Sequence, residues 1–191
     1  MGERNNSIIL YTAQSDLVMD IIEKEGVCYS KPEYVRRKYE ESSKIFLTAY
    51  NWYVEHARQI VPRPQGAEFP YWAYENVYDI ATDGTTNIVK LQVPLDEVVL
   101  FDTSEWKKIL CLEYLDPDRK KEQEFKEELE LRGLRSQDVM LSDFYPEFKE
   151  KIYKSWENLF RYHEDLKSRK RSFSSGIQGG LWRIKKEWMI V

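Results

Sequence analysis

Polar side chains stand at the end of the first apolar segment, where a ligand site is expected. Tyr11, Thr12 and Gln14 close the run from Ile8 to Gln14, which favours a β-strand. Backbone donors become free where a strand ends, so sites often lie in the turn that follows. These three side chains are therefore candidate ligand-binding groups. The alternative is an ordinary strand-to-helix turn in which Thr12 and Gln14 are simply solvated.

Aromatic residues form a second candidate site. The run Lys44 to Thr48 predicts another short strand, which leads into a helix that carries Tyr50 and Trp52. We expect these two rings to point to different faces, so that at least one can leave the core. Aromatic side chains can stack on a base or a nicotinamide ring, which contributes about 1–3 kcal/mol per base. The alternative for both rings is packing in the core.

Arginines and aromatic residues surround the proline-bounded loop at residues 62–70. Arg58 and Arg63 lie near its start, and Tyr71 and Trp72 follow its end. Guanidinium groups beside aromatic rings suit a ligand that contains both phosphate and an aromatic ring. A structural loop held in place by its aromatic residues is the alternative.

Gln178 precedes two glycines, Gly179 and Gly180, shortly before the last apolar segments. Glycine allows another backbone or a ligand to approach closely, so this segment is a candidate ligand-binding site. A plain β-turn is the alternative interpretation of this segment.

The compact basic patch of the sequence is made of Lys167, Arg169, Lys170 and Arg171. The whole chain of 191 residues has a net charge of −4, which argues against a protein that binds nucleic acid over its whole surface. The patch is therefore either a solvated loop or a local surface that attracts an anion or a nucleic acid.

Several common kinds of site have no signature here. The sequence holds no phosphate-binding loop, no glycine-rich dinucleotide motif and no paired histidines at metal spacing, so we expect no metal. His56 and His163 are predicted on helix surfaces, and Cys28 and Cys111 as buried free thiols. The polar first residues and the lack of a run of about 20 apolar residues predict a cytoplasmic protein without membrane contact.

The elements that must position these residues alternate between strand and helix patterns. Together they predict one α+β domain over residues 1–191, with a small mixed or antiparallel sheet flanked by amphipathic helices. A charged helical excursion is expected at about 116–171. The predicted helices cover residues 15–25, 32–43, 49–60, 103–114 and 144–166, and the predicted strands cover residues 8–12, 44–48, 88–93, 98–101, 181–184 and 188–191.

Four segments together resemble a prokaryotic family of uncharacterised domains. They are residues 10–14 (LYTAQ), 70–74 (PYWAY), 93–106 with Val93-Pro94, Asp102 and Trp106, and 181–184 (LWRI). The resemblance covers most of the chain. It supports a single domain and carries no assigned activity.

The order of elements also resembles ADP-ribosyltransferase-like folds, in which a polar residue of the first strand binds a ring and a late strand carries a catalytic Glu or Gln. In this resemblance Tyr11 and Thr12 match the first motif position, Thr48 or Tyr50 the second, and Gln178 the third. The first position usually holds His or Arg. The third is usually Glu, whose charge stabilises an oxocarbenium-like centre.

The resemblance implies a split sheet, NAD or a related nucleotide as the ligand, and transfer of ADP-ribose as the activity. It places Tyr11, Thr12 and Gln14 at the nicotinamide and Gln178 at the ribose, and it implies Tyr11, Thr48 and Gln178 as the candidate catalytic residues. In this assignment Tyr50 or Tyr71 stacks on a ring of the ligand, and Arg58 or Arg63 binds its phosphate. The rival hypothesis is a non-catalytic factor of a bacterial or phage defence or mobile-element system that binds protein or nucleic acid. A nuclease is a third hypothesis, for which a clustered carboxylate set is lacking.

Overall fold

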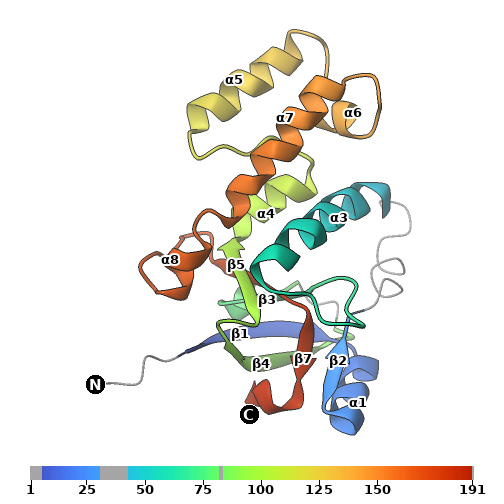
Figure 1. The fold of residues 1–191 in the computed structure, drawn as a ribbon, viewed down its shortest axis with the longest axis vertical. Coiled ribbons are helices and arrows are strands. Elements are labelled where there is room, and N and C mark those ends of the chain that lie inside the picture. Colours follow the sequence, from blue (N-terminus) through green and yellow to red (C-terminus); the bar gives the residue numbers. More distant parts are fainter. Residues whose placement is uncertain (1–5, 31–42, 82–83, 191) are drawn as a thin grey trace.

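A six-stranded antiparallel sheet forms the base of the molecule (Figure 1). The structure is a computed structural model that describes residues 6–30, 43–81 and 84–190. The strand order is β5-β6-β3-β1-β4-β8, and a second, two-stranded sheet pairs β2 with β7. The strands are β1 (Ser7–Gln14), β2 (Val27–Tyr29), β3 (Tyr71–Tyr74), β4 (Asn87–Pro94), β5 (Val98–Asp102), β6 (Ile177–Leu181), β7 (Arg183–Lys185) and β8 (Met189–Ile190).

Helices cover the sheet and extend beyond it. They are α1 (Asp16–Glu25), α3 (Ser43–Ile60), α4 (Thr103–Leu110), α5 (Arg119–Glu130), α6 (Ser136–Met140), α7 (Pro146–Trp156) and α8 (His163–Lys167), with short 3-10 helices η1 (Val77–Asp79), η2 (Glu157–Phe160) and η3 (Lys186–Trp188). None of the described helices is long and apolar enough to cross a membrane.

Side chains alternate between the two faces of the sheet, and each face has its own core. Leu10, Leu91 and Leu100 belong to the core on one face, with Val18 and Ile22 of α1. We call this face the α1 face.

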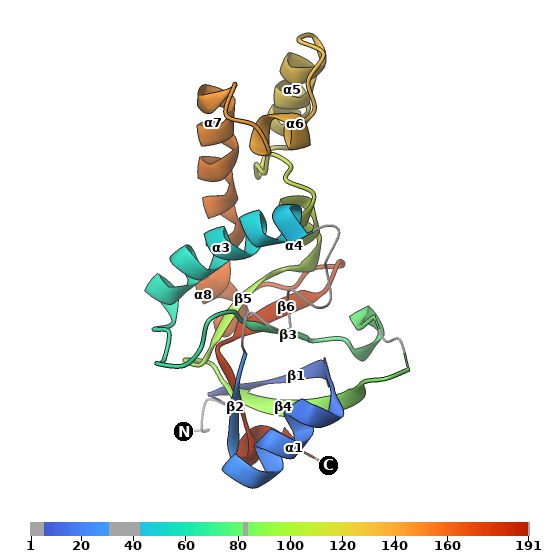
Figure 2. The ribbon, with the colours of Figure 1, turned by 90° about the vertical axis from the view of Figure 1, so that its right-hand side faces the viewer.

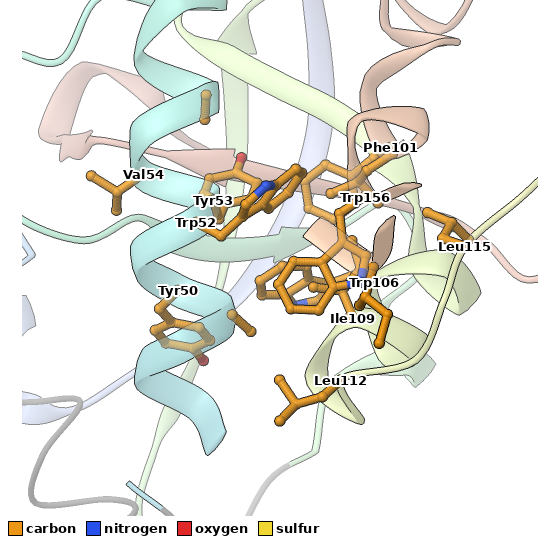
Figure 3. Close-up of a cluster of buried hydrophobic side chains, with 14 of the residues drawn as sticks. Tyr50, Trp52, Tyr53, Val54, Phe101, Trp106, Ile109, Leu112, Leu115 and Trp156 are labelled. Atoms are coloured by element: carbon orange, nitrogen blue, oxygen red, sulfur yellow. The ribbon is translucent and has the colours of Figure 1, made fainter. Parts of the chain in front are cut away.

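The opposite face packs against α3 and α4. Its core includes Val99 and Phe101 of β5 together with Tyr53 and Trp106 from the two helices. We call it the α3 face, and Figure 3 shows the aromatic side chains that fill it.

Helices α5, α6 and α7 project from the α4 end of the sheet (Figures 1 and 2). The expected charged excursion contains α5, whose Phe125 and Leu129 are buried while most of its charged residues are exposed. The predicted long helix at 144–166 is divided instead into α7, η2 and α8.

The strand predicted at Lys44 to Thr48 is wrong, because these residues form the first turns of α3. A short apolar run does not by itself distinguish a strand from a buried helix. Ile45 and Phe46 lie four residues before Ala49 and Tyr50, so they continue the same helical stripe. The Thr48 hydroxyl donates to the Lys44 carbonyl at 2.8 Å, a bond within the helix. Residues 32–42 of another predicted helix lie outside the described residues.

Two predictions about single residues are also wrong. Cys28 is buried as expected, whereas Cys111 is exposed at the end of α4. His163 is 4% exposed rather than on a helix surface. The alternative of a plain β-turn at Gly179 and Gly180 is wrong as well, because both residues lie inside strand β6.

Candidate functional site

One row of side chains crosses the α3 face of the sheet. The strand register pairs Tyr11 with Tyr74, Tyr74 with Gln178, and Gln178 with Phe101. On its other side, Tyr11 pairs with Lys90 of β4. Directly opposed residues of antiparallel strands project to the same face with neighbouring Cβ atoms about 4.5–5.5 Å apart. The row therefore places Gln178, Tyr74, Tyr11 and Lys90 side by side.

Burial decreases along this row. Gln178 is 2% exposed, Tyr74 and Tyr11 are half-buried, and Lys90 is exposed. One end of the row therefore lies under the helices and the other end in solvent. A ligand that follows the row meets an amide first, then two phenol rings, then a cation.

Gln178 has the properties of a ligand-binding group. It is a polar side chain within strand β6 and only 2% exposed. The amide offers both a donor and an acceptor, which suits a sugar hydroxyl.

An aromatic wall borders the buried end of the row. Trp72 lies two residues before Tyr74 on β3, and its indole Nε1 donates to the Tyr50 hydroxyl at 2.9 Å. The Trp72 ring centroid lies 4.8 Å from that of Trp106 and 4.9 Å from that of Tyr53. Trp72 is half-buried and Tyr50 is 4% exposed, so both rings serve mainly the core.

The sheet is weakly joined in its centre. Between β1 and β3 the ladder holds one register pair among the described residues, whereas β1 and β4 pair along eight residues. Beside that pair, the Thr12 hydroxyl donates to the Trp72 carbonyl at 2.8 Å. The Gln14 amide in turn donates to the Thr12 oxygen at 2.7 Å. We call this short β1–β3 junction the seam. It divides the sheet into two halves of three strands each.

Thr12 and Gln14 therefore do not join Tyr11 at the candidate site. Thr12 follows Tyr11 directly in β1, so its side chain lies on the α1 face. Thr12 is fully buried and Gln14 is 8% exposed, and their polar groups bridge the seam. Tyr71 is also on the α1 face, where its hydroxyl donates to the Cys28 sulfur at 3.1 Å.

The remaining sequence candidates are spread over α3 and the loop after it. Trp52 stacks on His56 and Phe160 in the core, with centroid distances of 4.4 and 5.7 Å. Arg58 is exposed and forms an ion pair with Glu55 of the same helix.

Thr48 and Arg63 lie in different surroundings. The Thr48 hydroxyl is occupied by its hydrogen bond within α3. Arg63 is exposed beside Glu55 and Glu68 in a shallow hollow. Of the eleven residues proposed from the sequence, the register brings Tyr11 and Gln178 into one row, with Trp72 and Tyr50 bordering it.

Two residues of the row were missed in the sequence. Tyr74 lies at the end of the aromatic run 70–74, and Lys90 lies in the strand predicted over residues 88–93. Only the strand register shows that the two residues flank Tyr11. The alternation of residues 88–93 marked Lys90 as a solvent-facing position. Among the described residues Lys90 has no carboxylate within ion-pair distance, so its charge is available to an anion.

Another hollow lies between α4, α5 and α6, with a volume of about 430 Å³. Its charged lining is paired internally: Lys108 lies 2.6 Å from Glu122, and Lys126 lies 3.8 Å from Glu130. Within the described residues, no group of three or more His, Cys, Asp or Glu side chains could hold a metal. We therefore take the row on the α3 face as the candidate site.

Comparison with known families agrees with the extent of this fold. The family model for a domain of unknown function, DUF3841, matches residues 9–190. The chain belongs to this family. The match begins inside β1 and ends in β8, so it includes residues of all six strands of the sheet. No curated protein and no solved structure matches the chain.

Proposed function

We propose that this DUF3841 domain is an ADP-ribosyltransferase-like domain that binds NAD or a related nucleotide on the α3 face of its sheet. The observation that carries the proposal is the row of Gln178, Tyr74, Tyr11 and Lys90 across four neighbouring strands. Tyr11 and Gln178 are the residues that the resemblance assigns to the first and third motif positions.

The chemistry of the row fits a nucleotide. Neighbouring strands lie about 4.8 Å apart, so Gln178 and Lys90 are separated by roughly 14 Å across three spacings. The Gln178 amide can donate to and accept from ribose hydroxyls, and Tyr74 and Tyr11 offer ring surfaces. Lys90 supplies a cation for phosphate, a role for which the sequence had suggested Arg58 or Arg63.

In ADP-ribosyl transfer, the bond between ribose C1 and the nicotinamide nitrogen breaks and its electron pair leaves with nicotinamide. An acceptor nucleophile then forms a bond to C1 and loses its proton. In this proposal Gln178 orients the ribose. Because its amide is neutral, it stabilises the positive charge at C1 less than a carboxylate does.

Calorimetry with NAD and with ADP-ribose tests the proposal. We expect Gln178→Ala to weaken binding of both compounds about tenfold, which corresponds to roughly 1.4 kcal/mol for the hydrogen bonds that are removed. Lys90→Ala should weaken ADP-ribose binding without changing the affinity for nicotinamide alone. Tyr71→Phe is the matched control, because Tyr71 lies on the opposite face.

A second measurement addresses transfer itself. Gln178→Glu adds the missing carboxylate and should raise the rate of nicotinamide release from NAD. The proposal is lost if neither NAD nor ADP-ribose binds the wild-type protein at millimolar concentration.

A further inference from the structure

The loop between α8 and β6 carries a basic surface for which the proposed function has no role. Four basic residues lie there: Lys167 at the end of α8, and Arg169, Lys170 and Arg171 after it. The neighbouring acidic residues are Glu164 and Asp165 of α8. Arg169, Lys170 and Arg171 are exposed, in a chain whose net charge is −4. We call residues 167–175 the basic loop.

The cations of this loop are only weakly neutralised. Arg171 lies 3.9 Å from Asp165, and Lys167 lies 3.4 Å from Glu164. Among the described residues, neither Arg169 nor Lys170 has a carboxylate within ion-pair distance. The local field is therefore positive.

Aromatic rings lie between the guanidinium groups. The Tyr162 ring is contacted by Arg171 at 3.8 Å and by Arg161 at 4.4 Å, measured from each guanidinium carbon to the ring centroid. Phe173 adds a second ring, 5.7 Å from that of Tyr162. The Arg161 guanidinium is held by the Glu105 carboxylate and the Asn158 carbonyl. Arg171 is exposed, so stacking orders its side chain while its N–H edge can still reach phosphate oxygens.

Arg169 has a left-handed backbone conformation, which is unfavourable for residues other than glycine. Its φ is +55°, in the left-handed region, directly after Ser168, the C-cap residue of α8. The amide of Lys170 bonds to the Asp165 carbonyl at 2.9 Å, and the amide of Arg169 bonds to the Leu166 carbonyl at 3.0 Å. The Arg169 guanidinium makes one long hydrogen bond, to the Ser7 carbonyl at 3.4 Å. Glycine is the preferred residue at this position of a helix end, so an arginine there costs stability and places a charge at the tip of the turn.

The loop is anchored at its other end. The Ser175 hydroxyl donates to Asp102 Oδ1 at 2.8 Å, and Gly176 accepts from the Thr103 amide at 3.2 Å. The cations therefore lie on a short segment that is fixed to α8 on one side and to β5 on the other (Figure 1).

We infer that the basic loop binds the phosphate backbone of a nucleic acid. Arginine and lysine without carboxylate partners, together with neighbouring rings and the exposed residues Ser172 and Ser174, form the donor set that phosphate and sugar contacts use. This surface is independent of the row on the α3 face.

Fluorescence anisotropy with a labelled 30-nucleotide single strand and the corresponding duplex tests the inference. The informative variant is Arg169→Gly with Lys170→Gln, because glycine suits the left-handed turn and should leave Tm unchanged or higher. We expect its affinity to be at least fivefold lower. The slope of log K against log salt should fall by about 0.7–0.9 for each phosphate that the variant no longer neutralises.

The matched control is Lys120→Gln with Lys121→Gln, which removes the same charge from the exposed face of α5. It should bind like the wild type. Gln178→Ala should also bind normally, which separates this inference from the proposed function. The inference is overturned if the wild type shows no salt-dependent binding, if both charge variants bind equally, or if polyglutamate competes as well as an unlabelled oligonucleotide.

Discussion

His163 fixes the edge of the sheet with a single hydrogen bond. Its Nδ1 accepts from the Leu100 amide of β5 at 3.0 Å, which requires that nitrogen to be unprotonated. Burial lowers the pKa of His163, the nearby Lys167 lowers it further, and Glu164 opposes both. Strand β5 is at the end of the sheet, where an unpaired amide would otherwise invite pairing with another chain.

We predict that mild acid destabilises the fold through His163. Its folded pKa lies below the unfolded value of about 6.5, so the unfolded chain binds more protons and stability falls as pH drops below neutrality. The slope is at most about 1.4 kcal/mol per pH unit. Urea unfolding at pH 7.5 and 5.5 measures it. His163→Phe should lower stability by about 1–3 kcal/mol at pH 7.5, since the Leu100 amide loses its acceptor, and should flatten the pH dependence.

His56→Gln is the control for this prediction, because His56 is only half-buried and bonds within its own helix. It should keep the pH dependence of the wild type. An unchanged pH dependence in His163→Phe would instead assign the effect to carboxylates.

Single residues also show where sequence reasoning reached its limit at the site. The polar end of β1 was recognised, but Thr12 and Gln14 lie on the face opposite Tyr11 because side chains alternate. Tyr74 and Lys90 flank Tyr11 only through strand register. Register depends on contacts between distant segments, so a single sequence carries little information about it.

At the scale of elements, Gly180 shows why β6 is glycine-rich. A Cβ atom at Gly180 would lie 2.1 Å from the Tyr53 hydroxyl oxygen and 2.8 Å from Tyr53 Cζ. The missing side chain thus allows α3 to pack directly on β6. The Tyr53 hydroxyl is buried without a hydrogen bond among the described residues, and burial raises its pKa well above the usual value.

We predict that Gly180→Ala destabilises the protein by about 1–3 kcal/mol, because it forces the Tyr53 ring away from the strand. Tyr53→Phe removes an unpaired hydroxyl and should be nearly neutral. In the double variant the closest clash is absent, so part of the stability should be recovered. Urea unfolding of the four proteins forms a double-mutant cycle. Additive effects would show that the two residues do not interact.

Elements with strong local signals were predicted well. The glycine stop of α1 is confirmed: Gly26 has φ of +76° and its amide bonds to the Ile22 carbonyl. The strands predicted over residues 88–93 and 98–101 are also present, as β4 and β5. The start of α3 was mistaken for a strand because the distant core, rather than the local pattern of five residues, decides its conformation.

At the scale of the whole molecule, one aromatic core joins the sheet to the projecting helices. Trp52 of α3 lies edge-on to Trp156 of α7, with ring centroids 5.5 Å apart (Figure 3). Trp156 Nε1 donates to the Glu113 carbonyl at 2.7 Å, and the Leu115 amide donates to the Ser155 hydroxyl at 3.0 Å. Helix α7 is thereby fastened to the segment that connects α4 with α5.

We predict that the sheet and the helices α5 to α7 unfold together in one transition. Trp156 is fully buried and contacts both parts, so Trp156→Ala should cost about 3–5 kcal/mol and lower the stability of the whole domain. Far-UV circular dichroism and tryptophan fluorescence should then give the same urea midpoint, both before and after the substitution. Phe144→Ala is the control, since Phe144 is 86% exposed and should change the midpoint little. Two separate midpoints, with only the earlier one moved by Trp156→Ala, would mean instead that α5 to α7 form an independent folding unit.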